Sequence, residues 1–131
     1  MRLEFLIPKR PLSMQAKRKN LQRWKDFVRL EASKVWTEKP CSGIDIHITM
    51  VYLYDKDPID TDNIIKPIQD ALKELVYDDD SLITDVESHR RPLRSTFDIT
   101  RLPLLLLKGI ISDNESVYVQ ICDAKPLEDY I

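Results

Sequence analysis

Hydrophobic residues change their spacing twice between positions 44 and 90, and no other feature of the chain constrains the fold as strongly. Over residues 44–54 apolar and polar residues alternate, which is the period of a β-strand. Over 62–76 apolar residues recur every three to four positions, as on one face of a helix, and Pro67 fits there only near the first turn. A second strand is predicted at 82–90. The segment therefore predicts a strand, a helix and a strand in succession.

The flanking segments add two strands and one helix to this unit. Residues 2–7 alternate, and so do residues 117–121 near the end of the chain. The apolar run 102–107 has no clear period, and it belongs either to the core or to a surface covered by a second subunit. We predict a single α+β domain (a two-layer α/β arrangement) over residues 1–131, with a small mixed sheet packed by two main helices in the order β-α-β-α-β-β. The first helix is predicted from a stripe of apolar residues at Leu21, Trp24, Val28, Ala32 and Val35.

Length and composition are those of a globular protein. The chain has 131 residues, of which 43% are hydrophobic and 32% charged, values typical of one folded domain. No apolar run approaches the ~18 residues of a membrane-spanning helix, and the N-terminus lacks a signal-peptide pattern. Cys41 and Cys122 have no metal-binding spacing, which favours two free thiols in a reducing compartment. These features predict a cytoplasmic protein with no membrane partner.

Charge is divided unevenly along the chain, although the net charge is only −2. Residues 1–40 hold 11 Lys and Arg against 4 Asp and Glu, whereas residues 41–131 hold 9 against 18. A basic segment of this kind favours a polyanion-binding face, and an acidic remainder is what a divalent-cation site contributes. Both segments can equally be solvated surface, so charge alone leaves the two interpretations open.

Seven aspartates lie between positions 57 and 80, around the predicted helix. Asp62, Lys66 and Asp70 are spaced four residues apart and share one helical face. Asp60 precedes the helix and Asp80 opens the next strand, so these carboxylates can converge on one point. Converging carboxylates repel one another unless a cation neutralises them, and oxygen ligands select Mg²⁺ or Mn²⁺. Beside such an ion, Lys66 would be a fixed positive charge acting on a phosphate.

Each of these residues also has a simpler interpretation. Asp62 can be a helix cap, and Lys66 with Asp70 an ordinary surface pair. The triple aspartate at 78–80 can be a solvated turn, and His47 is more simply a structural residue than a ligand. A calcium loop of the EF-hand type is disfavoured, because the required glycine-containing spacing of ligands is absent. Residue by residue the simpler interpretations are favoured, but the joint pattern is much harder to explain in that way.

That joint pattern is the string Asp60-x-Asp62-Asn63-x-x-Lys66-x-x-x-Asp70-Ala71-Leu72, followed by Asp79-Asp80. It resembles the signature of RusA-type endodeoxyribonucleases, a family of Holliday junction resolvases. Weaker similarity extends to Pro8-x-x-Pro11-x-Ser13 and to Arg90, so the resemblance covers roughly residues 3–91. The segment 92–115 fits no pattern of that family.

The resemblance implies a function and a metal site. Proteins of the family are small homodimers that cleave four-way DNA junctions symmetrically with Mg²⁺, in DNA recombination and repair. For this chain the resemblance assigns the metal-binding carboxylates to Asp60, Asp62 and Asp80, and the catalytic lysine to Lys66. It also implies a bacterial or phage origin.

Three further residues are expected to support this site. Asp70 matches the motif and is predicted to support Lys66 from the second shell of groups around the metal. Asn63 is expected to stabilise the start of the helix rather than to contact substrate. Asp79 is the alternative to Asp80 as the third ligand, since a triple aspartate permits a shift of one residue.

Two basic groups are predicted to contact DNA phosphates, which would position the DNA without specifying its sequence. The first group consists of Lys9, Arg10, Lys17, Arg18 and Lys19, and the second of Arg90 and Arg91.

The expected function is that of a Mg²⁺-dependent endonuclease, with Mn²⁺ as a possible substitute, acting on branched DNA as a homodimer. A nuclease acting on other branched or single-stranded nucleic acid is one alternative. A non-catalytic DNA-binding or interaction module, with the leucine run as its contact surface, is another.

Overall fold

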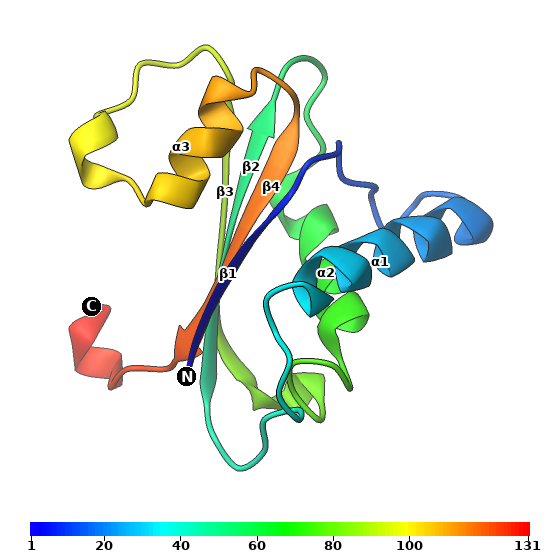
Figure 1. The fold of residues 1–131 in the computed structure, drawn as a ribbon, viewed down its shortest axis with the longest axis vertical. Helices are drawn as coiled ribbons and strands as arrows, with labels where there is room; N and C mark the ends of the chain where they lie inside the picture. Colours follow the sequence, from blue (N-terminus) through cyan, green and yellow to red (C-terminus); the bar gives the residue numbers. More distant parts are fainter.

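The computed structural model describes all residues from 1 to 131 and contains four strands and three α-helices (Figure 1). The α+β class predicted from the sequence is confirmed. The strands are β1 (Arg2–Ile7), β2 (Ile46–Tyr54), β3 (Ile83–Pro92) and β4 (Ser116–Asp123). The helices are α1 (Arg18–Ser33), α2 (Ile65–Leu72) and α3 (Leu104–Ile111). Short 3₁₀ turns occur at η1 (Thr61–Ile64), η2 (Asp80–Leu82), η3 (Ile99–Arg101) and η4 (Leu127–Asp129).

The four strands form one mixed sheet in the order β1-β4-β2-β3. β4 is antiparallel to both β1 and β2, whereas β2 and β3 are parallel, with Tyr52 opposite Arg90. Parallel neighbours need a crossover connection, and the segment that contains α2 supplies it. The acidic segment singled out from the sequence is this crossover, and it therefore runs beside β3, an edge strand of the sheet.

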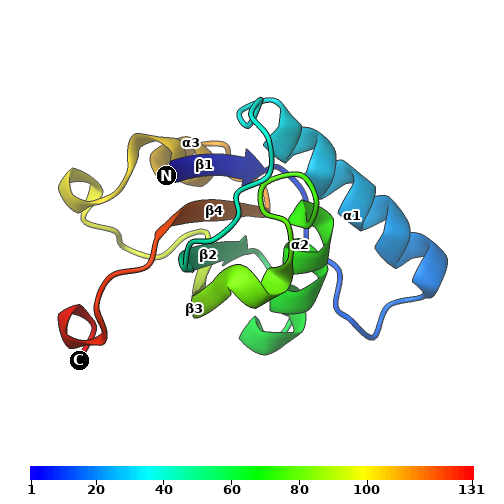
Figure 2. The ribbon, with the colours of Figure 1, turned by 90° about the horizontal axis from the view of Figure 1, so that it is seen from below.

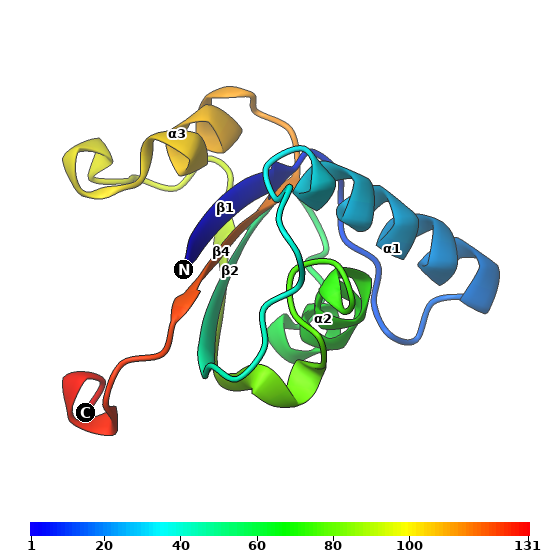
Figure 3. The same ribbon diagram turned by 60° about the horizontal axis from the view of Figure 1, so that its bottom comes forward.

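Helices cover both faces of the sheet, with α1 and α2 on one face and α3 on the other (Figures 2 and 3). The main core lies beneath α1 and α2, where Phe5, Val119 and Met50 stand opposite one another on β1, β4 and β2. Trp24 and Val28 of α1 pack into the same core. The alternation of apolar residues along these strands directs one complete face toward the helices, and its burial is the main favourable contribution to folding.

Two predicted helices are shorter in the structure. The segment 62–76 divides into η1 and α2, and α2 ends at Leu72. Pro67 is the third residue of α2, a first-turn position where the missing proline N–H costs no hydrogen bond. Glu74 has a φ of 66°, a left-handed conformation that cannot continue a helix. Since α1 ends at Ser33, Val35 lies beyond it and is exposed, so its predicted place on the buried stripe is wrong.

The apolar run near 102–107 forms α3, a helix that the predicted order β-α-β-α-β-β lacks. Leu106 packs with Leu53 and Tyr118 in a second, smaller core on the far face of the sheet. Leu104 on the outer side of α3 is exposed. Because both sides of this helix are apolar, no hydrophobic period marks it in the sequence. No helix of the protein combines the length and the apolar character needed to cross a membrane.

Two smaller predictions concern residues away from the crossover. Cys41 and Cys122 are free thiols, as expected. His47 is buried on β2, where its Nε2 lies 3.1 Å from Thr49 Oγ1 and its ring stacks on Tyr130. These contacts are those of a structural histidine.

Candidate active site

The carboxylates singled out from the sequence lie along the crossover that joins β2 to β3. Asp60 and Asp62 occupy the start of η1, which follows β2, and both are exposed. Asp80 opens η2, immediately before β3, and is half-buried. Lys66 lies between them in the first turn of α2.

Three hydrogen bonds hold the η1 turn in place. Two of them anchor it to β3, and the third anchors it to the connector between β1 and α1. Asn63 stabilises the turn through its backbone carbonyl, whereas its side chain makes no hydrogen bond. The three bonds join Ser88 Oγ to Thr61 O at 2.8 Å, Arg90 Nη1 to Ile59 O at 3.1 Å, and Met14 N to Asn63 O at 3.2 Å.

Lys66 is held between two carboxylates. Its Nζ lies 2.5 Å from Asp80 Oδ2 and 3.0 Å from Asp70 Oδ1. The hydrogen bond to Asp80, followed by that to Asp70, raises the pKa of Lys66 above its ordinary value. Lys66 is therefore fully protonated at neutral pH, and in this setting it can act as a fixed positive charge but not as a general base.

Asp70 connects Lys66 to the neighbouring helix. Its Oδ1 accepts from Lys66, while its Oδ2 lies 3.6 Å from Lys25 Nζ on α1. A row of alternating charges thus runs through Lys25, Asp70, Lys66 and Asp80. The contact predicted between Asp70 and Lys66 is present. Lys25 was not predicted, because its place in the row depends on how α1 packs against α2, which no spacing in the sequence indicates.

The two neighbouring aspartates at the end of the crossover have different partners. Asp79 caps η2, since Ser81 N donates to its Oδ2 at 3.2 Å, and its Oδ1 lies 3.2 Å from Lys73 Nζ. The hydrogen bonds from Ser81, together with Lys73, lower the pKa of Asp79 to about 2. Asp79 is thereby committed to the turn, whereas Asp80 is the aspartate that contacts Lys66.

The predicted convergence of Asp60, Asp62 and Asp80 is not found in this arrangement. No three or more histidine, cysteine, aspartate or glutamate side chains lie close enough together to hold a metal ion. Instead Asp60 Oδ1 faces Arg90 Nη1 at 3.4 Å, and Asp80 faces Lys66. Each of these two carboxylates is neutralised by a cation of the chain itself, which removes the repulsion that would otherwise oppose their approach.

The donor set nevertheless suits a hard divalent cation. All three candidate ligands are carboxylates, which Mg²⁺ and Mn²⁺ prefer. Two of the three already have a positively charged partner, so this part of the molecule accommodates positive charge. Arg90, which the sequence indicated as a phosphate contact, is placed by the structure beside a candidate ligand.

The predicted phosphate contacts differ in how free they are. Arg10 is engaged by the carbonyls of residues 56 and 57 and by Glu115, so it connects the connector to two other loops. Lys9 lies over the ring of Phe27, 4.1 Å from its centroid. Arg91 donates to the neighbouring carbonyl of Arg90. By contrast, three consecutive cations at the start of α1 are exposed and in no ion pair, namely Lys17, Arg18 and Lys19.

Comparison with known proteins gives one family match, which spans the candidate site. The protein-family model Endodeoxyribonuclease RusA matches residues 6–100, a span that includes the whole crossover and β3. No curated protein matches the chain. Because the family match covers well over half of the 131 residues, the chain belongs to the RusA endodeoxyribonuclease family.

Proposed function

We propose that the protein is a Mg²⁺-dependent endonuclease that resolves four-way DNA junctions by phosphodiester hydrolysis, acting as a homodimer in recombination and repair. The observation that carries this proposal is the ammonium group of Lys66, held between Asp70 and Asp80 in a chain of the RusA family. A fixed cation beside carboxylates suits phosphodiester hydrolysis, because the cation stabilises charge that develops on the phosphate and the carboxylates are ligands for a divalent ion.

In the mechanism that we propose, Asp60, Asp62 and Asp80 would hold the Mg²⁺ ion. When bound, the ion activates water and neutralises charge that develops on the phosphate. Lys66 then exchanges its contact with Asp80 for a non-bridging oxygen of the scissile phosphate. Asp70 keeps its hydrogen bond with Lys66 during this exchange, so the ammonium group stays oriented. Lys66 remains charged throughout, because Asp70 still raises its pKa and the phosphate replaces Asp80 as its anionic partner.

Arg90 and Asp79 support this arrangement from the two ends of the crossover. Arg90 binds the carbonyl of Ile59, so it retains the η1 turn when Asp60 turns toward another cation. Asp79 fixes the η2 turn that presents Asp80. Both residues position carboxylates of the crossover.

The DNA would be held by the exposed cations at the start of α1. Lys17, Arg18 and Lys19 have no partner within the chain and are free to bind phosphates. Two symmetric cuts in one junction require two active sites at a fixed spacing, which one subunit cannot supply. An isologous dimer meets this requirement.

Cleavage of a labelled four-way junction with and without Mg²⁺ tests the proposal. The native protein should make paired symmetric nicks that depend on the metal. Asp80→Asn should lower the rate at least about a hundredfold, because it removes a ligand that faces Lys66. The matched control is Asp79→Asn, which makes the same charge change one residue away and should keep most of the activity, because the amide oxygen of asparagine can still accept the hydrogen bond from Ser81 N.

Three results would contradict parts of the proposal. Equal loss in the two variants would remove the distinction between Asp79 and Asp80. Preference for flaps or single strands over junctions would favour the other nuclease. Tight junction binding without cleavage in Mg²⁺ or Mn²⁺, and without metal binding in calorimetry, would indicate a non-catalytic module.

A further inference from the structure

A hollow of about 330 Å³ lies between the connector that follows β1 and the first half of α1. Its floor is apolar and partly aromatic, formed by Leu12, Trp24 and Phe27. Its rim carries the cations Lys9 and Arg23. A small, mostly apolar hollow with a few polar groups is the usual form of a site for a small flat ligand. The candidate active site uses none of the floor residues.

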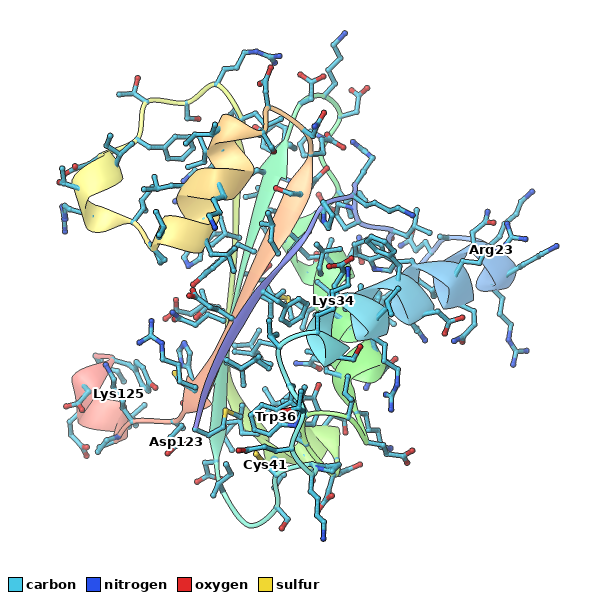
Figure 4. The ribbon with its side chains drawn as sticks, in the orientation of Figure 1. Arg23, Lys34, Trp36, Cys41, Asp123 and Lys125 are labelled. Atoms are coloured by element: carbon cyan, nitrogen blue, oxygen red, sulfur yellow. The ribbon has the colours of Figure 1, made fainter.

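The charged side chains that line this hollow are all basic. None of the side chains that line it is acidic. Two polar hollows elsewhere, one near Asp55 and one near Asp70, are lined by carboxylates as well as cations. Arg23 is exposed and forms no ion pair, and Figure 4 shows it projecting from α1 into solvent. The hollow therefore suits an anionic ligand that also carries a flat apolar part.

The aromatic floor has features that suit a nucleobase. The ammonium group of Lys9 lies 4.1 Å from the centroid of the Phe27 ring, so one face of that ring is covered only by the end of a flexible side chain. Trp24 is buried, and its indole N–H has no hydrogen-bond partner in the structure. A buried donor without a partner is unusual. Every pyrimidine carries a ring carbonyl, which is an acceptor of the kind that this donor lacks.

A second hollow continues the basic rim along α1. It is lined by Arg18, Lys19, Gln22 and Arg23, and it shares Arg23 with the first hollow. Cations in a line can follow the backbone of a nucleic acid, while an aromatic surface beside them takes a base. The connector also touches the active-site turn, since Met14 N donates to the carbonyl of Asn63. The connector that lines the first hollow thus also contacts the η1 turn of the candidate active site.

We propose that the hollow between the connector and α1 binds one unstacked base of the DNA substrate. The base stacks on Phe27, and the phosphates beside it bind Arg23 and Lys9, whose ammonium group moves from the ring to the phosphate. The proposal rests on the proposed function, since the point where the arms of branched DNA meet is where base stacking can be interrupted. Stacking tolerates any base, so this site recognises an unpaired nucleotide without reading its sequence.

Fluorescence of Trp24 tests the proposal in the absence of cleavage. The chain has two tryptophans, so a Trp36→Phe background makes Trp24 the single reporter. This protein is titrated in EDTA with a short oligothymidylate and with an abasic backbone of equal length. We expect the oligothymidylate to change the Trp24 emission and to bind about tenfold more tightly than the abasic strand.

Two variants and a control separate the base from the phosphates. Phe27→Leu should reduce the tenfold preference to within about twofold, because the stacking surface is lost. Arg23→Gln should weaken both strands similarly and reduce the salt slope by about 1. Lys125→Gln, on the C-terminal tail far from α1 in Figure 4, makes the same charge change and should leave binding unchanged. Thermal unfolding checks that each variant is folded. If Phe27→Leu does not fold, the comparison of oligothymidylate with the abasic strand in the protein that retains Phe27 still tests the proposal.

The outcomes distinguish this proposal from the proposed function. Equal binding of the two strands, or the same Trp24 change with inorganic phosphate alone, would overturn the base site and leave an anion site. Preferential binding of the oligothymidylate through Trp24 would support the base site even if junctions were not cleaved in Mg²⁺. Cleavage that depends on Asp80, with no preference between the strands, would support the function and overturn the base site.

Discussion

α2 and α3 have the same length, eight residues each, yet they lie on opposite faces of the sheet and differ in what they expose. α2 buries Leu72 and turns Lys66 and Asp70 outward as a hydrogen-bonded ion pair. α3 buries Leu106 and exposes Leu104, with no ion pair of its own. Charge held in a defined position is what phosphodiester chemistry requires, whereas apolar burial supplies stability. Under the proposed function, the chemistry lies on the α2 face, whereas the α3 face contributes stability.

The largest expected effect is on the α2 face. Lys66→Met should lower junction cleavage about 10²- to 10³-fold, since it removes a preorganised positive charge. Thermal stability should change little, because a partly exposed ion pair contributes at most about 1 kcal/mol. The matched control is Lys73→Met, whose ammonium group binds Asp79 at the end of the crossover. A similar loss of cleavage in both variants would contradict a special role for Lys66.

The opposite result is expected on the α3 face. Leu106→Ala should lower the free energy of unfolding by about 2–3 kcal/mol, because Leu106 is nearly fully buried against Leu53 and Tyr118. Leu104→Ala, at an exposed position of the same helix, should stay within about 0.5 kcal/mol of the native value. Urea unfolding measures both changes. Loss of cleavage by folded Leu106→Ala would break the separation of the two faces.

The same difference explains which elements the sequence predicts. β1 begins and ends where its alternation predicts, and α2 is recognisable because apolar and charged residues alternate in a helical period. α3 was missed, since Leu104 and Leu106 are equally apolar although they point to opposite sides. The end of α2 was predicted too late, because Leu75 and Val76 continue the apolar pattern after the backbone has left the helix at Glu74.

The candidate site is predicted in part, for a related reason. The contact between Lys66 and Asp70 follows from a spacing of four residues, which the backbone of a helix converts into proximity. The contacts of Asp80 with Lys66 and of Asp60 with Arg90 depend on the path of the crossover along β3. Lys25 reaches Asp70 only through the packing of two helices. Long-range contacts of this kind leave no periodic mark on the sequence.

A smaller effect tests how Asp70 contributes on the α2 face. Asp70→Asn should lower cleavage about tenfold, because Lys66 loses one of the two anions that orient it. The pKa of Lys66 should fall as well, since Asp70 helps to raise it. Lys66 would then lose its proton at a lower pH, and the alkaline decline of cleavage should begin earlier in Asp70→Asn than in the native protein. An alkaline limb that does not move would show that Asp70 has only a structural role.

The smallest predicted effect concerns Asp79 and its dependence on pH. Its pKa in the folded protein is about 2, below the value of about 3.9 for an unfolded aspartate, because its charged form accepts hydrogen bonds from Ser81 and pairs with Lys73. The stability that this carboxylate contributes is therefore fully present above about pH 4 and is lost as the pH falls toward 2. The difference in unfolding free energy between the native protein and Asp79→Asn should be constant near neutral pH and should shrink between pH 4 and 2. Asp78→Asn is the control, since the Asp78 carboxylate makes no hydrogen bond or ion pair. A difference that persisted unchanged to pH 2 would mean that the Asp79 side chain stabilises the turn without its charge. The η2 turn would then not depend on an ionised carboxylate at this position.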